Sequence, residues 1–147
     1  MDKFTRIYSL ALLVIGLGVL IGILYERPIV SELNAVLKSN EVLSKYSYRF
    51  RVTKVEQGIA SMTTPRSAEF PTSLALPLLY VELRDEKTDS ETFLEAQQEM
   101  ARVQGIAKKL VTRHADITGV VWTLDTKWLR NNGINPDLLG ATRSDTN

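Results

Sequence analysis

An uncharged stretch of nineteen residues, from Ile7 to Tyr25, limits the folds open to this chain more than any other feature. The hydrocarbon core of a bilayer is about 30 Å thick and an α-helix rises about 1.5 Å per residue, so roughly 20 apolar residues span it. The stretch is therefore long enough to cross a membrane as a helix. We expect a single transmembrane helix over residues 7–25, preceded by a short leader over residues 1–6.

The charges that flank this stretch indicate its orientation. Lys3 and Arg6 precede it, whereas Glu26 and Arg27 on the far side cancel each other. Because positive flanks stay in the cytoplasm, we expect a cytoplasmic N-terminus and a domain on the outer side, in a bacterial inner membrane. The alternative is a cleaved signal peptide, which has a shorter apolar segment ending at small residues. The long run and its large following residues favour an uncleaved anchor.

Two glycines in the second half of the apolar stretch predict a contact surface within the membrane. Gly18 and Gly22 form a GxxxG pair, and glycines four apart lie on one helix face, where another helix backbone can approach closely. The alternative is that the pair faces lipid, since glycine is common in transmembrane helices.

The composition excludes several kinds of functional site. With 18 Lys and Arg against 17 Asp and Glu, the chain has no overall field that would attract a nucleic acid backbone. It has no cysteine and one histidine, His114, which leaves no ligand set for an iron–sulfur cluster or for most zinc sites. We expect no cofactor, no metal and no nucleic acid partner. An enzyme site built from carboxylates such as Asp85, Glu86 and Asp125 stays open as an alternative.

Two segments after the apolar stretch show clear periodicity. Apolar residues at helical spacing predict an amphipathic helix over residues 28–39 that begins at Pro28. Alternating residues then predict a strand over residues 46–55, with aromatic residues on one face and Arg49 and Arg51 on the other. Arginines interleaved with aromatic residues can also bind an anionic polymer. In a strand, however, the arginines point away from the aromatic residues, so we interpret this segment as an ordinary edge or surface strand.

Residues 58–73 are rich in Ser, Thr and Pro, and they predict a loop without regular structure. Loops of this length inside a compact domain are either functional or disordered, so this one is either a contact surface or a solvated linker. The candidate partner surface comprises Arg49, Arg51, Pro65, Arg66 and Pro71.

The second half of the chain predicts three further elements. The apolar run over residues 78–83 predicts a strand that is covered on both faces. Thr88 and Glu91 match a capping box, and the apolar spacing that follows predicts a helix over residues 89–113. Residues 117–124 predict another strand.

Shorter features close the chain. Asp125 or Thr126 is placed to cap a short helix, and we expect a disordered tail over residues 140–147. His114 falls at the predicted end of the long helix, where a histidine typically stabilises the helix C-terminus.

These elements predict an α+β fold, in which a single N-terminal transmembrane helix is followed by a small domain of αββαβ type over residues 26–139. Its three-stranded sheet carries one long helix. At the level of topology alone, this order resembles the small ring-building and assembly domains on single-pass proteins of secretion and sporulation machines. We expect a non-catalytic accessory or assembly subunit that binds other membrane protein subunits, with a homo-oligomer, a membrane-anchored enzyme and a ligand-binding head as the alternatives.

Overall fold

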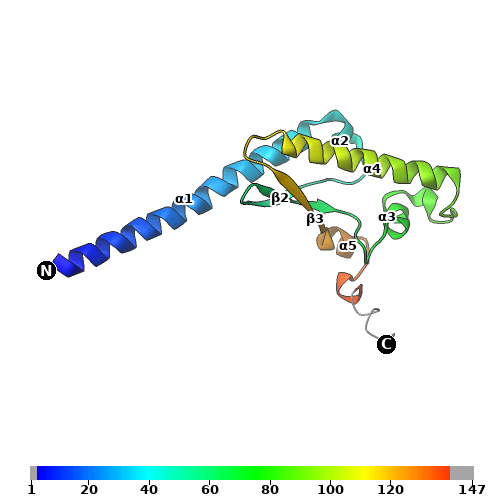
Figure 1. Ribbon diagram of the computed structural model, residues 1–147. Coiled ribbons are helices and arrows are strands. Elements are labelled where there is room, and N and C mark those ends of the chain that lie inside the picture. The colour runs from blue at the N-terminus through cyan, green and yellow to red at the C-terminus, as the bar shows by residue number, and fades with distance from the viewer. Residues whose placement is uncertain (1–2, 140–147) are drawn as a thin grey trace.

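The computed structural model describes residues 3–139, so the predicted tail over residues 140–147 and the first two residues of the leader lie outside the described residues. A long N-terminal helix leads into a small domain of helices around one three-stranded sheet (Figure 1). The expected mixed class with a three-stranded sheet is confirmed. In chain order the elements are α1 (Lys3–Ser39), α2 (Glu41–Lys45), β1 (Val52–Glu56), β2 (Ile59–Thr64), α3 (Thr72–Leu79), the 3-10 helix η1 (Val81–Leu83), α4 (Glu91–Thr112), β3 (Gly119–Leu124), α5 (Thr126–Asn131) and the 3-10 helix η2 (Pro136–Leu138).

Helix α1 continues through Pro28, whereas the sequence predicted a separate helix beginning there. A proline inside a helix removes one backbone hydrogen bond, so the continuation needs support from packing. Ile29, Leu33 and Leu37 supply it, because they lie four residues apart on one face and are buried in the core of the domain. The transition from the apolar stretch to the domain is therefore one unbroken helix.

The first part of α1 projects away from the domain (Figure 1). All described side chains from Ile7 to Ile23 are exposed, and none of the apolar window is buried inside the protein. Among the described residues, this is the one helix that is long and apolar enough to cross a membrane. Exposed apolar surface of this extent needs a membrane or a partner to cover it.

The sheet has the strand order β1-β2-β3. Strands β1 and β2 are antiparallel and are joined by a two-residue turn, Gln57-Gly58, in which both residues have positive φ. Strands β2 and β3 are parallel, with Ala60 paired to Val120 and Met62 to Trp122 in register. The chain between these parallel strands contains α3 and α4, which is the crossover that a parallel pair requires.

The predictions for the first two strands were wrong in their positions. Strand β1 covers residues 52–56 and not 46–55, and β2 lies inside the segment 58–73 that was predicted to be a loop. Residues 46–51 still alternate between buried and exposed, as predicted. The Thr63 N–H still donates to the Arg51 carbonyl over 2.8 Å, but the Arg51 N–H donates to the Thr63 hydroxyl over 3.2 Å and not to a backbone carbonyl.

The apolar segment predicted as a strand over residues 78–83 is helical. It is divided between α3 and η1, and Pro77 lies inside α3. A short run that is apolar on all sides suits a buried strand and a buried helix equally well, so periodicity does not separate the two. The prediction therefore had the right number of strands, but it counted this helical segment as a strand and missed β2.

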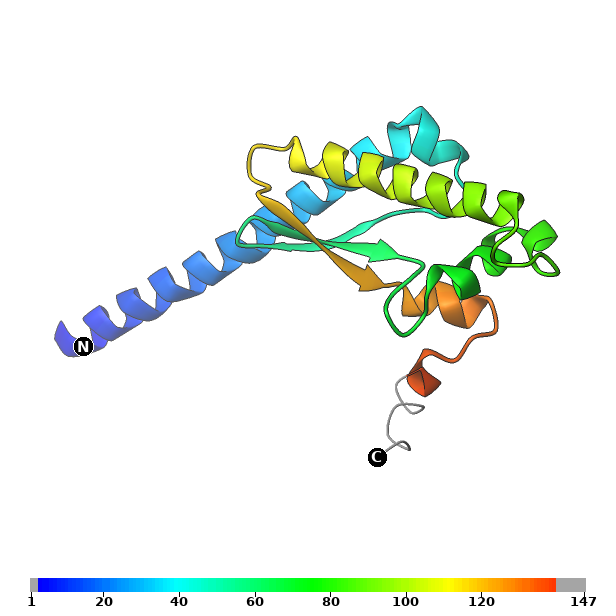
Figure 2. The same cartoon turned by 45° about the vertical axis from the view of Figure 1, so that its right-hand side comes forward.

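Helix α4 confirms the long helix expected from the sequence. It covers Glu91–Thr112, and its N-cap is Ser90, whose hydroxyl accepts a hydrogen bond from the Phe93 N–H over 3.3 Å. The capping residue is thus Ser90 and not Thr88. Phe93, Met100 and Val103 on one face of α4 are fully buried. Figure 2 shows α4 lying across one face of the sheet, beside the second part of α1.

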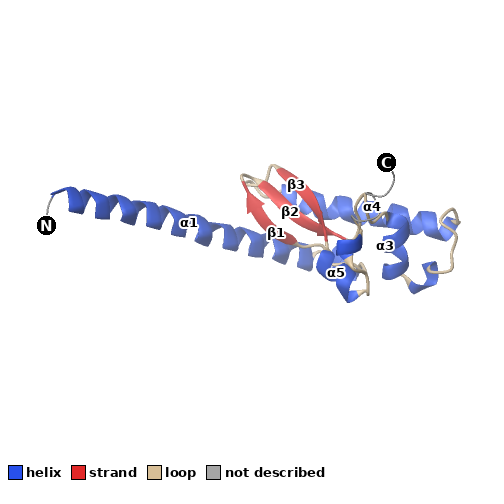
Figure 3. Cartoon of the chain, turned by 90° about the horizontal axis from the view of Figure 1, so that it is seen from below, coloured by secondary structure: helices blue, strands red, loops and turns tan. Residues whose placement is uncertain are grey.

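The opposite face of the sheet carries exposed residues. Lys54, Ile59 and Val121 face outward there, and Val121 is 53% exposed. Figure 3 shows the three strands from this side, with α5 at the end of β3. Of the two candidate caps, Asp125 and Thr126, it is Asp125 that caps α5, by accepting a hydrogen bond from the Trp128 N–H over 2.9 Å.

Candidate functional site

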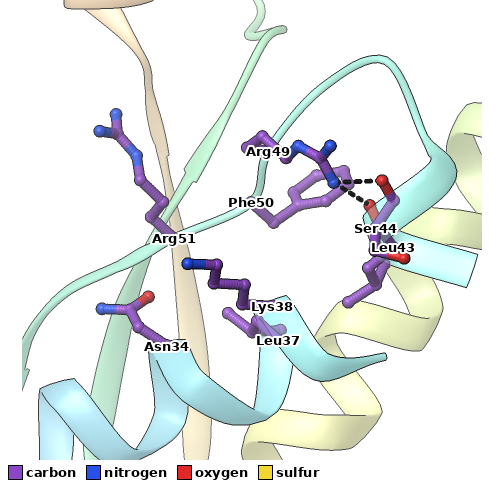
Figure 4. Close-up of a pocket in the computed structure, with 8 residues that line it drawn as sticks. All are labelled: Asn34, Leu37, Lys38, Leu43, Ser44, Arg49, Phe50 and Arg51. Atoms are coloured by element: carbon purple, nitrogen blue, oxygen red, sulfur yellow. Dashed lines mark hydrogen bonds between the residues drawn. The ribbon is translucent and has the colours of Figure 1, made fainter. Parts of the chain in front are cut away.

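A cleft opens where the end of α1, the short helix α2 and the segment leading into β1 meet. Its volume is about 640 Å³, which lies within the range of ligand sites in proteins. Figure 4 shows its side chains. They are Asn34, Leu37, Lys38, Leu43, Ser44, Arg49, Phe50 and Arg51.

The floor of the cleft is apolar. Leu37 of α1, Leu43 of α2 and Phe50 are each at most 6% exposed, and all three belong to the hydrophobic core. Leu43 is fixed because Asn40 caps α2 and accepts a hydrogen bond from the Leu43 N–H over 3.1 Å. The ring of Phe50 packs edge-on against Trp122, with 5.9 Å between the centroids. These two contacts hold Leu43 and Phe50 in the floor of the cleft.

Arg49 forms one wall and is held by the C-terminal end of α2. Its guanidinium donates to the carbonyls of Leu43, over 3.2 Å, and Ser44 (Figure 4). These carbonyls would otherwise lack partners at the end of a helix. Because both acceptors are neutral, the guanidinium keeps its full positive charge at the cleft.

Lys38 supplies a second cation from α1. Figure 4 shows its ammonium group reaching across the cleft toward the segment that carries Phe50. Within residues 3–139, no carboxylate forms an ion pair with Lys38. A lysine without an internal partner remains free to bind an anion from outside.

Arg51 separates this cleft from a smaller adjoining hollow of about 350 Å³. Its guanidinium pairs with the carboxylate of Asp125 over 2.9 Å and remains 49% exposed, whereas Asp125 is buried. The hydroxyl of Tyr48 donates to the same carboxylate oxygen over 2.9 Å. Burial raises the pKa of the Tyr48 hydroxyl, and the negative charge of Asp125 adds to this shift. Lys127 and Trp128 complete the hollow.

Only two of the five residues of the candidate partner surface come together. Arg49 and Arg51 both line the cleft and the adjoining hollow. Pro65 is fully buried, so it lies in the core and not on a surface. Arg66 binds the side-chain oxygen of Gln104 on α4, with both nitrogen–oxygen distances between 3.0 and 3.2 Å. Pro71 is exposed at the start of α3.

Gly18 and Gly22 lie in the exposed part of α1. A Cβ atom added at either position would meet no other atom within 4 Å. The chain itself therefore does not require glycine at these two positions. The same is true of Gly16, which lies two residues from Gly18 and so on another face of the helix.

Of the eight residues that line the cleft, sequence reasoning singled out Arg49 and Arg51 and missed the other six. Lys38 and Asn34 lie in the segment predicted as an amphipathic helix over residues 28–39, and neither was assigned a role there. Asn34 is tied to β1 through Val52, where its amide oxygen accepts from the N–H and its amide nitrogen donates to the carbonyl. The position of Asn34 beside the apolar residues Leu33 and Leu37 was a sequence signal that its side chain contacts the domain. The sequence does not show that β1 is the strand it contacts.

The carboxylates of the alternative enzyme hypothesis have different surroundings. Asp85 and Glu86 are exposed in the turn after η1, whereas Asp125 is buried and engaged by Tyr48 and Arg51. In the part of the chain that the structure describes, no group of three His, Cys, Asp or Glu side chains is placed to hold a metal ion.

His114 lies just beyond the end of α4. Its Nε2 atom is 3.7 Å from the carboxylate of Glu32 on α1, and its Nδ1 atom accepts a hydrogen bond from the Asp116 N–H over 3.3 Å. His114 therefore connects the end of α4 to α1.

No family model, curated protein or solved structure matches this chain.

Proposed function

We propose that this protein is a non-catalytic, single-pass membrane subunit that takes part in a larger membrane protein complex through protein–protein contacts. Its N-terminus is cytoplasmic, and its domain lies on the outer side of a bacterial inner membrane. The role is accessory or in assembly: the span binds other helices, and the domain presents a surface at a fixed place above the bilayer.

The continuity of α1 carries this proposal. The same helix that exposes apolar side chains from Ile7 to Ile23 buries Leu33 and Leu37 in the domain core. Asn34 fastens it to β1 through two hydrogen bonds to Val52. A tether would need only a flexible linker, whereas an unbroken helix packed into the domain sets its height and orientation. Such a fixed geometry favours a subunit that binds a partner at a defined height and orientation.

The glycines of the span support a helix contact. Because Gly18 and Gly22 make no close contact within this chain, the space beside them is open to another helix. The other helix belongs either to another subunit or to a second copy of this chain.

The proposal is tested by gentle detergent extraction of the tagged protein from its native membrane, followed by size analysis and identification of the retained proteins. We expect a larger assembly with defined partners. The Gly18→Leu, Gly22→Leu double variant should lose partners, whereas the Gly16→Leu control should retain them. A stable, monodisperse monomer without retained proteins would contradict the proposal.

The orientation has a direct test, because the chain has no cysteine. A single cysteine introduced at exposed Lys108 should react with a membrane-impermeant maleimide in intact spheroplasts. Labelling only after the membrane is opened would show that the domain lies in the cytoplasm.

A further inference from the structure

The cleft and the adjoining hollow lie next to each other, one on either side of Arg51. They share Arg49 and Arg51, and together they extend from Lys38 on α1 to Lys127 on α5. An extended peptide advances about 3.3 Å per residue, so a segment of several residues fits such a site better than a compact ligand does.

The charges of this site select an anion. Its cations are Lys38, Arg49, Arg51 and Lys127, against the single carboxylate of Asp125. That carboxylate is buried and already bound by Tyr48 and Arg51. The chain as a whole is nearly neutral, so this excess is local and attracts a carboxylate-bearing partner to this place.

The apolar floor adds a second requirement. Leu37, Leu43 and Phe50 lie at the bottom of the larger cleft, where 3–6% of each residue stays exposed and their side chains offer no hydrogen-bonding group to a ligand. A large aliphatic or aromatic side chain would cover them, with flanking carboxylates at Lys38 and Arg49. An apolar anchor surrounded by charged contacts is the usual arrangement at a protein–protein contact.

The position of the cleft along α1 argues against a lipid headgroup as its ligand. Lys38 lies thirteen residues beyond Tyr25, the end of the apolar stretch, which is about 20 Å along a helix. The headgroup layer on one side of a bilayer is only about 5–8 Å thick. The cleft therefore lies above the headgroups, where a protein segment can reach it.

We propose that this cleft binds an extended acidic segment of a partner protein, with one large apolar side chain on the floor formed by Leu37, Leu43 and Phe50 and its carboxylates on Lys38 and Arg49. This inference rests on the proposed function, and it names the surface and the chemistry of the domain's partner.

The test uses the full chain in phosphatidylcholine nanodiscs and the fluorescein-labelled hexapeptide Asp-Glu-Leu-Phe-Glu-Asp, with binding followed by fluorescence anisotropy. We expect saturable binding that weakens as salt is added. The peptides Lys-Lys-Leu-Phe-Lys-Lys and Asp-Glu-Gly-Ser-Glu-Asp should each bind at least about tenfold more weakly, because one lacks the carboxylates and the other lacks the anchor.

Lys38→Glu is the decisive variant, because Lys38 is exposed and has no ion-pair partner within the described residues, so its replacement breaks no ion pair within them. We expect it to weaken binding of the acidic peptide about tenfold or more. Lys108→Glu on α4 is the matched control, since it makes the same change in net charge outside the cleft and should leave the affinity unchanged. Equal weakening by both variants, or equal binding of all three peptides, would overturn the proposal.

Three further results separate the alternatives. Competition by nanodiscs that contain phosphatidylglycerol would assign the site to lipid and overturn the peptide proposal. Absence of peptide binding by a protein that still purifies with its partners would overturn the cleft proposal alone. Peptide binding by a protein that purifies without partners would instead contradict the proposed function and leave the cleft assigned.

Discussion

The side-chain amide of Asn34 pairs with both backbone polar groups of Val52, accepting from the N–H over 2.8 Å and donating to the carbonyl over 2.9 Å. These two groups lie on the outer edge of β1, the side that does not face β2. The amide thus occupies the place that another strand would take. It covers the edge of the sheet at Val52 and joins α1 to the domain.

Replacing Asn34 should lower the stability of the domain. Asn34→Ala leaves two partly buried backbone groups without partners, which costs about 1–3 kcal/mol of unfolding free energy. Denaturant unfolding of the full chain in detergent measures this loss. Ser31→Ala, on the exposed face of the same helix, is the control and should stay within about 0.5 kcal/mol of wild type. Equal stability of the two variants would show that the Asn34 bonds do not hold α1 to β1.

The buried carboxylate of Asp125 should couple Tyr48 to α5. Asp125→Asn keeps an acceptor for the Trp128 N–H but removes the charge that pairs with Arg51. Tyr48→Phe removes the hydrogen bond to Asp125, at a cost of about 1–2 kcal/mol. Because both changes act on one network, the double variant should lose less stability than the two single losses added together. A double-mutant cycle from denaturant unfolding gives the coupling, and strict additivity would contradict it.

The stability of the domain should fall in alkaline solution because of two buried tyrosines. Burial raises the pKa of Tyr46 and of Tyr48, with additional contributions from neighbouring Tyr80 and Asp125 respectively. In the unfolded chain both hydroxyls titrate near pH 10, so the unfolded state loses protons there that the folded state retains. Their contribution to stability is therefore complete below about pH 10 and declines above it, by up to about 1.4 kcal/mol per pH unit for each tyrosine.

The measurement is the denaturant midpoint between about pH 8 and 11. Tyr46→Phe, Tyr48→Phe removes both groups, so the stability of this double variant should decline less steeply with pH than that of wild type. Parallel profiles would show that other groups cause the alkaline loss.

Sequence reasoning located the elements with strong local signals. The uncharged run, the 3.6-residue period of α4, the β-branched strand β3 and the Asp125 cap of α5 are all present in the structure. The signal for each of them lies within a short stretch of the chain, even for β3, whose hydrogen-bond partners are in β2. Such signals are visible in a single sequence.

The errors concern segments whose structure depends on distant partners. Strand β2 looks like a polar loop, yet Ala60 and Met62 are fully buried between two strands and beneath helices. The one local signal was the pair Gln57-Gly58, a two-residue turn with glycine in second place. The cleft was even harder to predict from the sequence. It is lined by both Lys38 on α1 and Arg49 after α2, and no spacing in the sequence indicates that these residues come together.

The unbroken course of α1 through Pro28 leads to a prediction that separates the two interpretations of this proline. Inside a helix, proline costs up to about 3 kcal/mol relative to alanine, whereas at the first turn of a new helix it costs little. Because Pro28 lies well inside α1, Pro28→Ala should stabilise the protein and increase the protection of the following amides from hydrogen exchange. Pro136→Ala is the matched control, because Pro136 begins η2 and should give no such gain. If both substitutions leave exchange at residues 28–32 unchanged, the helix begins anew at Pro28, and the exposed first part of α1 and the domain are not joined as one rigid element.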